Sequence, residues 1–178
     1  NTGAEFDRQW PKTVAAVINS GADVVGIMEL ENDGYGPDSA MRFLVDQLNA
    51  VTAPDTYAFI DADAGTGQAN ALGTDAIRVG LIYKPAKVTP AGRTAVLNTP
   101  AFVTGGDDEA RNRPALAQAF EENATGERFI VAVNHLKSKG SACANPDTGD
   151  GQGNCAVVRT EAANLLAQWL ATDPTGTG

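Results

Sequence analysis

An uninterrupted apolar run that ends in carboxylates constrains the fold of this chain more than any other stretch. Residues 24–28 read Val-Val-Gly-Ile-Met and lie between Asp23 and the acidic residues Glu29 and Glu31. A run without polar alternation is typical of a strand buried on both faces, and most such strands are parallel and flanked by helices. Because open α/β sheets bind ligands at the carboxyl ends of their strands, we expect Glu29 in such a crevice. Its carboxylate could bind a hard divalent cation or could simply solubilise the strand end.

Hydrophobic periodicity predicts the other elements. Helices are expected over about residues 9–19, from Asp38 or Ser39 to about residue 51, and over about residues 156–172. Strands are expected over residues 23–29, 57–60 and 77–83, near Val88, and over residues 115–120 and 128–134. The short polar link between the last two strands predicts an antiparallel hairpin. The Gly-, Ala- and Asp-rich stretch 61–74 predicts a mobile surface loop with almost nothing to bury.

Composition and charge limit the classes of function. The chain has 178 residues, of which 43% are hydrophobic and 20% charged, and these are values of a globular domain. No apolar run approaches the roughly 18 residues of a membrane span. The net charge of −9 argues against passive binding of nucleic acid, because phosphates must be neutralised by Lys and Arg. A polyanionic substrate would therefore need bound cations to carry part of the electrostatic work.

The two cysteines, Cys143 and Cys155, lie in a loop rich in Gly, Asn and Asp. Exposed polar surroundings suit a disulfide in an oxidising compartment better than a structural free thiol. Closing so short a loop would add about 3 kcal/mol by the loop-entropy model. A zinc site is the weaker alternative, because there is no Cys-x-x-Cys spacing and no nearby histidine.

The candidate chemistry centres on His135, the only histidine. It follows a buried-type strand, and an imidazole suits general acid or base work, although a lone histidine is more often structural. Lys137 and Lys139 follow it and could meet phosphate oxygens or form a solvated strand end. Arg111 and Arg113 precede a strand; guanidinium groups match phosphate bidentately, but such a pair is usually surface charge.

Four segments carry a family resemblance. Residues 23–29, 77–83, 113–114 and 134–139 read Asp-Val-Val-Gly-Ile-Met-Glu, Ile-Arg-Val-Gly-Leu-Ile-Tyr, Arg-Pro and Asn-His-Leu-Lys-Ser-Lys. In this order they resemble the endonuclease/exonuclease/phosphatase superfamily, and especially its large secreted bacterial nucleases. The stretch Gly-Asp-Gly-Gln-Gly-Asn at residues 149–154, ahead of an Arg-bearing final helix, is similar to a segment of those extracellular proteins. The resemblance covers nearly the whole chain.

The resemblance implies an α/β (α+β) fold in which two mixed β-sheets pack face to face between helices. It also implies metal-assisted hydrolysis of a phosphodiester. Glu29 matches the family's metal-binding glutamate, which would hold Mg²⁺, or else Mn²⁺ or Ca²⁺, to polarise the phosphate. His135 matches the histidine that contacts the phosphate and can relay a proton.

Further site residues follow from the same resemblance. Arg113, in preference to Arg111, matches a phosphate-facing arginine beside Pro. Asp75 is the nearest candidate for an acidic residue that orients the histidine. Asn134 and Lys137, which flank the histidine, are expected to bind substrate.

The chain also departs from the family pattern. It lacks the family's opening strand with an Asn, and it lacks the later Gly-Asp-x-Asn and Ser-Asp-His motifs. Residues 1–178 are therefore expected to be the front portion of one catalytic domain, with part of the second sheet beyond Gly178. We expect this chain alone to have little or no turnover, and its unpaired sheet edge to favour self-association.

Three functions are consistent with these observations. The first is a secreted, metal-dependent nuclease acting on DNA or RNA. The second is a phosphoesterase of lipids or small phosphates, similar to a sphingomyelinase, which accords better with the net charge of −9. The third is a noncatalytic extracellular module that has kept the fold without the chemistry.

Overall fold

The structure is a computed structural model that describes residues 2–144 and 149–178. Within these ranges the helices and strands are α1 (Gly3–Ser20), β1 (Val24–Glu31), α2 (Ala40–Val51), β2 (Ala58–Phe59), α3 (Ala62–Thr66), β3 (Ile77–Tyr83), β4 (Val88–Leu97), α4 (Pro100–Thr104), β5 (Arg113–Glu122), β6 (Arg128–His135) and α5 (Ala156–Leu170). None of the described helices has the length and apolar character needed to cross a membrane.

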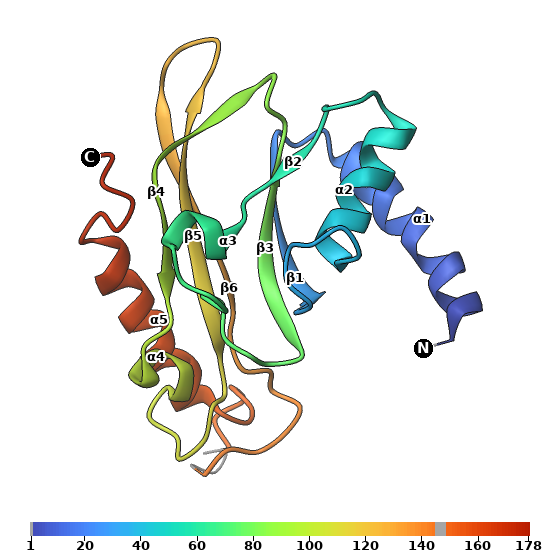
Figure 1. Cartoon of the computed structure of the whole chain (residues 1–178). Helices are drawn as coiled ribbons and strands as arrows, with labels where there is room; N and C mark the ends of the chain where they lie inside the picture. Colours follow the sequence, from blue (N-terminus) through green and yellow to red (C-terminus); the bar gives the residue numbers. More distant parts are fainter. Residues whose placement is uncertain (1, 145–148) are drawn as a thin grey trace.

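Two three-stranded sheets pack face to face between helices (Figure 1). Sheet A has the strand order β1-β3-β2, and sheet B has the order β4-β5-β6. Apolar side chains from both sheets, among them Val79, Leu81, Leu116 and Phe120, fill the space between them. This arrangement confirms the expected α/β sandwich with helices on its outer faces.

The helices cover the outer faces of the two sheets. Helices α1 and α2 bury Val14, Met41 and Leu48 against sheet A. Helices α4 and α5 bury Phe102 and Ala162 against sheet B. Each of these two pairs of helices therefore adds an apolar layer outside the core that joins the sheets.

The expectation of a parallel first strand, buried on both faces, is wrong. Strand β1 pairs antiparallel with β3, and among the described strands β3 is its only neighbour. Met28 in β1 is 57% exposed. An apolar run can thus form an antiparallel edge strand that is only partly covered, since Leu30 is the one buried residue of β1.

The composition of residues 61–74 predicts a mobile surface loop with almost nothing to bury, and this prediction is wrong. They contain α3, and Ala62, Ala71 and Leu72 are buried. The carboxylate of Asp63 accepts the backbone N–H groups of Asn70 and Ala71, at 3.1 and 3.0 Å. The segment is compact because this carboxylate folds it back on itself, and because small side chains fit closely against β4.

Several element boundaries also differ from expectation. Helix α1 begins at Gly3, because Thr2 and Glu5 form a capping box, and Pro11 therefore lies inside the helix instead of in its first turn. Strand β4 is ten residues long, and the short helix α4 was not expected.

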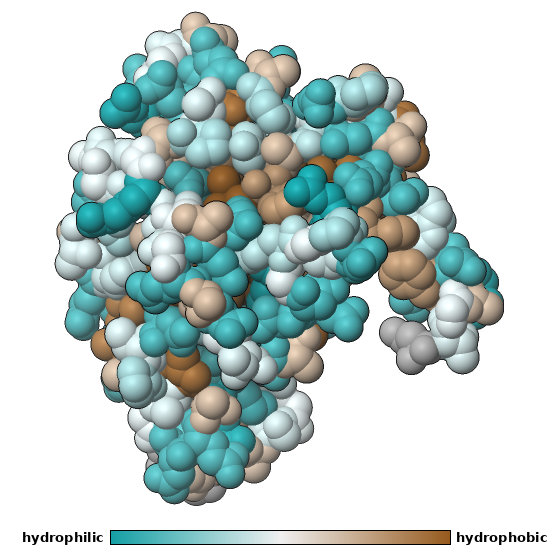
Figure 2. All heavy atoms as spheres, viewed as in Figure 1, coloured by the Kyte–Doolittle hydropathy of each residue, from teal (hydrophilic) through white to brown (hydrophobic). Residues whose placement is uncertain are grey.

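The N-terminal half of α1 extends past sheet A (Figure 1). The face of the molecule seen in Figure 2 is largely hydrophilic, with apolar side chains in small groups.

Strands β5 and β6 form the predicted antiparallel hairpin. Strand β3 has the predicted bounds, but its residues 78–82 are buried on both faces because it is the central strand of sheet A.

Candidate functional site

A cleft of about 470 Å³ lies where β1, β5 and β6 meet at one end of the sandwich. The predicted residues that line it are Glu29, Asp75, Arg111, Arg113, His135 and Lys137. These residues come from four separate stretches of the chain, which converge on one site. The volume is within the range of ligand pockets in proteins.

Irregularities in two strands aim side chains into this cleft. The register between β1 and β3 shifts between Ile27 and Leu30, and Glu29 in this bulge has a φ of 60°. The register between β5 and β6 shifts between Arg113 and Leu116, where Pro114 cannot donate a ladder hydrogen bond. Bulges of this kind redirect side chains next to functional sites.

A close approach of the two sheets brings Glu29 and His135 together. A Cβ on Gly26 of β1 would lie 2.8 Å from Cγ2 of Val133 on β6, so the strands approach closely only because this residue is glycine. Two to three residues further along, Glu29 Oε1 lies 3.7 Å from His135 Nε2. Residues more than a hundred positions apart thus meet in the cleft, as the resemblance implies.

The two partners differ in their surroundings. The Glu29 side chain is 71% exposed, whereas that of His135 is 17% exposed. The other ring nitrogen of His135, Nδ1, is buried without a hydrogen-bond partner among the described residues. No carboxylate in the described part of the chain therefore accepts a hydrogen bond from Nδ1, and Glu29 is the acidic neighbour of Nε2.

Asp75 pairs with Arg113 and not with His135. Its Oδ2 accepts a hydrogen bond from Arg113 Nε at 2.8 Å, and Arg113 is the residue opposite His135 in the β5–β6 ladder. The expectation that Asp75 orients the histidine is therefore not met by the contacts. The reason is its position: Asp75 lies before β3 begins, where its carboxylate reaches the start of β5 instead of the end of β6.

Lys137 lines the cleft from the loop that follows β6. Its ammonium lies between 2.9 and 3.4 Å from backbone and hydroxyl oxygens of Ser138 and Ser141. Its backbone N–H donates to Asn112 Oδ1 at 2.9 Å. Lys137 is 9% exposed, and within the described residues it forms no ion pair with a carboxylate. Its positive charge is therefore not neutralised by an acidic neighbour there.

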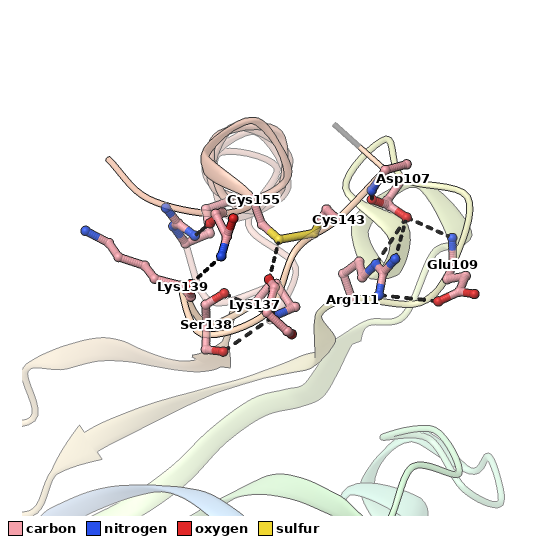
Figure 3. Close-up of a disulfide and its surroundings, with 12 residues drawn as sticks. Asp107, Glu109, Arg111, Lys137, Ser138, Lys139, Cys143 and Cys155 are labelled. Carbon is pink, nitrogen blue, oxygen red and sulfur yellow. Dashed lines mark hydrogen bonds and ion pairs between the residues drawn. A yellow bond between two sulfur atoms is a disulfide. The ribbon is translucent and has the colours of Figure 1, made fainter. Parts of the chain in front are cut away.

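Arg111 is held by acidic residues of the preceding loop (Figure 3). Its guanidinium lies 3.1 Å from Asp107 Oδ1 and 3.3 Å from Glu109 Oε2. Burial alone would raise the pKa of Asp107, but hydrogen bonds from the N–H groups of Ala144 and Glu109, together with Arg111, bring it below its ordinary value. Arg111 is consequently less available for a substrate than Arg113.

The predicted disulfide is present between Cys143 and Cys155. It joins the loop after β6 to the start of α5, next to Lys137 and the Asp107–Arg111 pair (Figure 3). The N–H of Ala144, beside Cys143, donates to Asp107 Oδ2 at 2.8 Å. The disulfide therefore lies beside the basic side of the cleft and connects to it through hydrogen bonds.

Asn134 is not among the residues that line the cleft. Alternate residues of a strand point to opposite faces, and its neighbour His135 points into the cleft. The side chain of Asn134 therefore lies on the other face of β6, which does not favour the expected role in substrate binding.

One residue of the site was missed in the sequence. Asn112 is 4% exposed, and its side chain joins the carbonyl of Phe102 to the N–H of Lys137. In the pattern Arg-Asn-Arg-Pro only the arginines suggest phosphate chemistry. No local signal indicates that the asparagine between them is buried.

The donor set offers limited support for a metal ion. Within the described residues there is no group of three or more His, Cys, Asp or Glu side chains that could hold one. Glu29 can supply one oxygen ligand, and Mg²⁺ is often held by one or two carboxylates together with substrate phosphates and water. The described residues thus supply one protein ligand of a magnesium site, namely Glu29. Asp75 is not available as a second ligand, because its carboxylate accepts a hydrogen bond from Arg113.

Solved structures with a similar architecture give the comparison that decides the fold. A mannosyl-6-phosphatase of Bacteroides thetaiotaomicron aligns with a TM-score of 0.57 and 16% identity, over 99% of this chain and 57% of its own. An endonuclease/exonuclease/phosphatase family protein of the same organism aligns with a TM-score of 0.59 and 16% identity, over 99% and 56%. This chain has the endonuclease/exonuclease/phosphatase fold.

A third structure with this fold is the human Nocturnin catalytic domain with a bound sulfate anion. It aligns with a TM-score of 0.55 and 14% identity, over 94% of this chain and 52% of its own. The chain spans a little over half the length of each of the three structures. No family model matches the sequence, and no curated protein sequence matches it.

Proposed function

We propose that this chain is the front portion of the catalytic domain of a phosphoester hydrolase. The observation that carries the proposal is the convergence of Glu29, Arg113 and His135 on one cleft, with Glu29 Oε1 3.7 Å from His135 Nε2. An acidic residue for a cation, a guanidinium for phosphate and an imidazole for proton transfer are the groups that phosphoester hydrolysis needs. The fold shared with a mannosyl-6-phosphatase and the sulfate in the Nocturnin structure support the same chemistry.

Four residues of the cleft have a defined part in this mechanism: Asp75, Arg113, Lys137 and His135. Asp75 accepts the Nε–H of Arg113, and the terminal N–H groups of the guanidinium can then donate to phosphate oxygens. Lys137 contributes a positive charge that no carboxylate among the described residues neutralises. His135 Nε2 donates a proton to an oxygen of the reacting phosphate, as a general acid. Most of the catalysis is therefore positioning and charge stabilisation.

A divalent cation, Mg²⁺ or else Mn²⁺ or Ca²⁺, would be held by Glu29. When bound, such an ion polarises the phosphate and stabilises the leaving oxygen. Because only one carboxylate of the described residues is directed to it, binding to this chain alone is expected to be weak.

The substrate we propose first is nucleic acid, with the protein acting as a secreted nuclease. The disulfide between Cys143 and Cys155 accords with an oxidising, extracellular compartment. The alternative is a small or lipid phosphoester, which accords with the net charge of −9 and with the substrate named for the mannosyl-6-phosphatase. Hydrolysis of nucleic acid should weaken steeply with added salt, whereas hydrolysis of a small phosphomonoester should not.

The partner we propose for the open side of the sandwich is the remainder of the catalytic domain. Among the described strands, β1 has β3 as its only neighbour and β6 has only β5. Met28, Phe129 and Ile130 on these two strands are 57, 41 and 39% exposed. Unpaired edges with exposed apolar side chains accept further strands, and without them they favour self-association, which light scattering measures.

The test compares turnover with Mg²⁺ for this chain and for a longer chain that contains it and continues past Gly178. Plasmid DNA, RNA and a sugar phosphate serve as substrates. We expect no turnover by residues 1–178 alone and clear turnover by the longer chain. His135→Ala should lower the latter about 10²- to 10⁴-fold, because a positioned proton donor is lost. Arg128→Ala, at the opposite end of β6, is the control and should change nothing.

Full activity of the His135→Ala variant of the longer chain would contradict the proposal. Failure of the longer chain to hydrolyse any of the three substrates, and a sphingomyelin vesicle as well, would favour the noncatalytic module instead.

A further inference from the structure

We propose that Asn32 is a positioning residue, which fixes the direction of Arg113 by holding the segment that carries Asp75. The inference rests on the proposed function, because the direction of Arg113 matters only if the cleft binds phosphate. Asn32 follows β1 and is half-buried. It does not line the cleft and would act entirely through its neighbours.

Both contacts of the Asn32 side-chain amide go to one short segment. Its Nδ2 donates to the carbonyl oxygens of Gly73 and Asp75, at 3.0 and 2.9 Å. Its backbone N–H donates to the carbonyl of Ala76 at 3.0 Å. The primary amide has two N–H donors, so both can be used here. Three hydrogen bonds from one residue therefore fix the chain just before β3.

The segment is confined on its other side by β5. Gly73 has a φ of +80°, and a Cβ at this position would lie 3.3 Å from Cγ of Pro114. A left-handed backbone and a close approach both favour glycine. Residues 73–75 are consequently held between the residue that follows β1 and the first residues of β5.

The Asp75 carboxylate in turn fixes the position of the Arg113 guanidinium. Its Oδ1 accepts the N–H of Ala76 at 2.7 Å, and its Oδ2 accepts Arg113 Nε at 2.8 Å. Both carboxylate oxygens are used, which leaves the carboxylate a single orientation. Arg113 in turn lies opposite His135 in the β5–β6 ladder. The hydrogen bonds thus run from Asn32, at the end of β1, through the segment of Asp75 to Arg113, which lies opposite His135 in sheet B.

The ion pair between Asp75 and Arg113 is too exposed to do this alone. The two side chains are 52 and 26% exposed, and ion pairs of this kind contribute little because water and salt screen them. Asn32 adds neutral hydrogen bonds to the backbone, which salt does not screen. Its amide is also specific: an aspartate would present oxygens to carbonyl oxygens, and an alanine would leave the carbonyls without their donor.

The chain offers a matched control in Asn49. Its Nδ2 donates to the carbonyl of Tyr57 at 3.0 Å, and its Oδ1 accepts the N–H of Tyr57 at 2.8 Å. It is a half-buried asparagine that holds a neighbouring segment, as Asn32 does, but it lies on α2 outside the cleft. The Asn49→Ala variant therefore measures how much stability is lost with a structural asparagine that does not act on Arg113.

The experiment titrates the whole chain with pyrophosphate and follows the Arg Nε–Hε signals by NMR, with thermal unfolding measured in parallel. We expect pyrophosphate to move the Arg113 signal in the wild type. Asn32→Ala should weaken binding about tenfold, since a small misplacement of a positioning group has effects of this order or larger. Asn49→Ala should lower the thermal midpoint and leave binding unchanged.

A double-mutant cycle separates positioning from general destabilisation. If Asn32 acts through Asp75, Asn32→Ala should have no further effect on binding in an Asp75→Ala background, which has no side-chain oxygen to accept Arg113 Nε. Additive losses would overturn the inference, and so would wild-type affinity in Asn32→Ala. If Asn32→Ala does not fold, Gly73→Ala displaces the same segment and should give the same loss; unchanged affinity in that variant would equally overturn it. If the wild type itself does not bind pyrophosphate, it is the proposed function that fails.

Discussion

The two walls of the cleft are built in different ways. On the side of sheet B, the Arg113, Arg111 and Lys137 side chains are each held by neighbouring oxygens and are at most 26% exposed. On the side of sheet A, Glu29 is 71% exposed and has a left-handed backbone. The basic wall is therefore preorganised, whereas the acidic residue extends into solvent from a strained position.

The distribution of charge follows the same division. Residues 1–76 contain twelve acidic and three basic residues and account for the whole net charge of −9, whereas residues 77–178 contain ten of each. All the basic residues that line the cleft come from the second part of the chain. A strongly negative net charge therefore does not exclude an anionic substrate, because the basic groups gather at one place.

The largest effect we expect comes from removing the disulfide that lies beside the basic wall. A Cys143→Ser, Cys155→Ser variant should lose about 3 kcal/mol of unfolding free energy, because its unfolded chain is less constrained. Urea unfolding measures the loss. Reductant should destabilise the wild type and have no effect on the variant; equal stability of the two proteins would show that the disulfide does not brace this wall.

The distance between the walls can be changed at Gly26. Gly26→Ala introduces a methyl group 2.8 Å from Val133 Cγ2, and such overpacking should cost about 1–3 kcal/mol. Thermal unfolding gives the size of the effect. Val133→Ala in the same chain should recover part of the loss, and a Gly26→Ala variant as stable as the wild type would mean that the sheets can separate freely here.

The strain on the acidic wall can be relieved at Glu29. The backbone of Glu29 has a φ of 60°, which glycine adopts without a steric penalty. The Glu29→Gly variant should therefore gain up to about 1 kcal/mol of stability. The same variant should lose divalent-cation binding, measured by calorimetry. Glu31→Gly, two residues further on in β1, has an ordinary backbone and should be destabilised instead. Destabilisation by Glu29→Gly would contradict the strain.

The smallest effect concerns the acid sensitivity of the basic wall. The pKa of Asp107 is below its ordinary value, so its contribution to stability is complete above about pH 4 and is lost as the pH falls through the lower, folded-state value. Asp107→Asn should be less stable at neutral pH and should lose less stability between about pH 4 and 2. Urea midpoints across this range test it; parallel curves for the two proteins would rule out the assigned role.

Local sequence patterns predicted the regular parts of the fold. The alternation of residues 77–83 and the turn-rich link before Arg128 identified β3 and the β5–β6 hairpin, because both depend on neighbours in the sequence. The polar loop identified the disulfide. The direction in which β1 pairs could not be predicted, because it depends on β3, which lies some fifty residues later.

The candidate site was predictable in its chemistry and not in its contacts. Glu29 and His135 stand out as a carboxylate and an imidazole at strand ends, and the resemblance to a known family added Arg113. The partner of Asp75 could not be deduced, since it depends on how the stretch before β3 meets the start of β5. Asn32 and Asn112 carry no local signal, because an asparagine that holds a distant carbonyl has the same neighbours in sequence as one in an exposed loop.

The sequence by itself determined which chemical groups this protein has and which stretches form strands, because hydrophobic periodicity and residue type act locally. Only the tertiary structure decided that Gly26 lets β1 approach β6, that Glu29 and Arg113, next to two bulges, meet in one cleft, and that Asn32 holds the segment that carries Asp75. The reason is that a bulge and a close approach depend on the partner strand, and the sequence does not state which strands are partners.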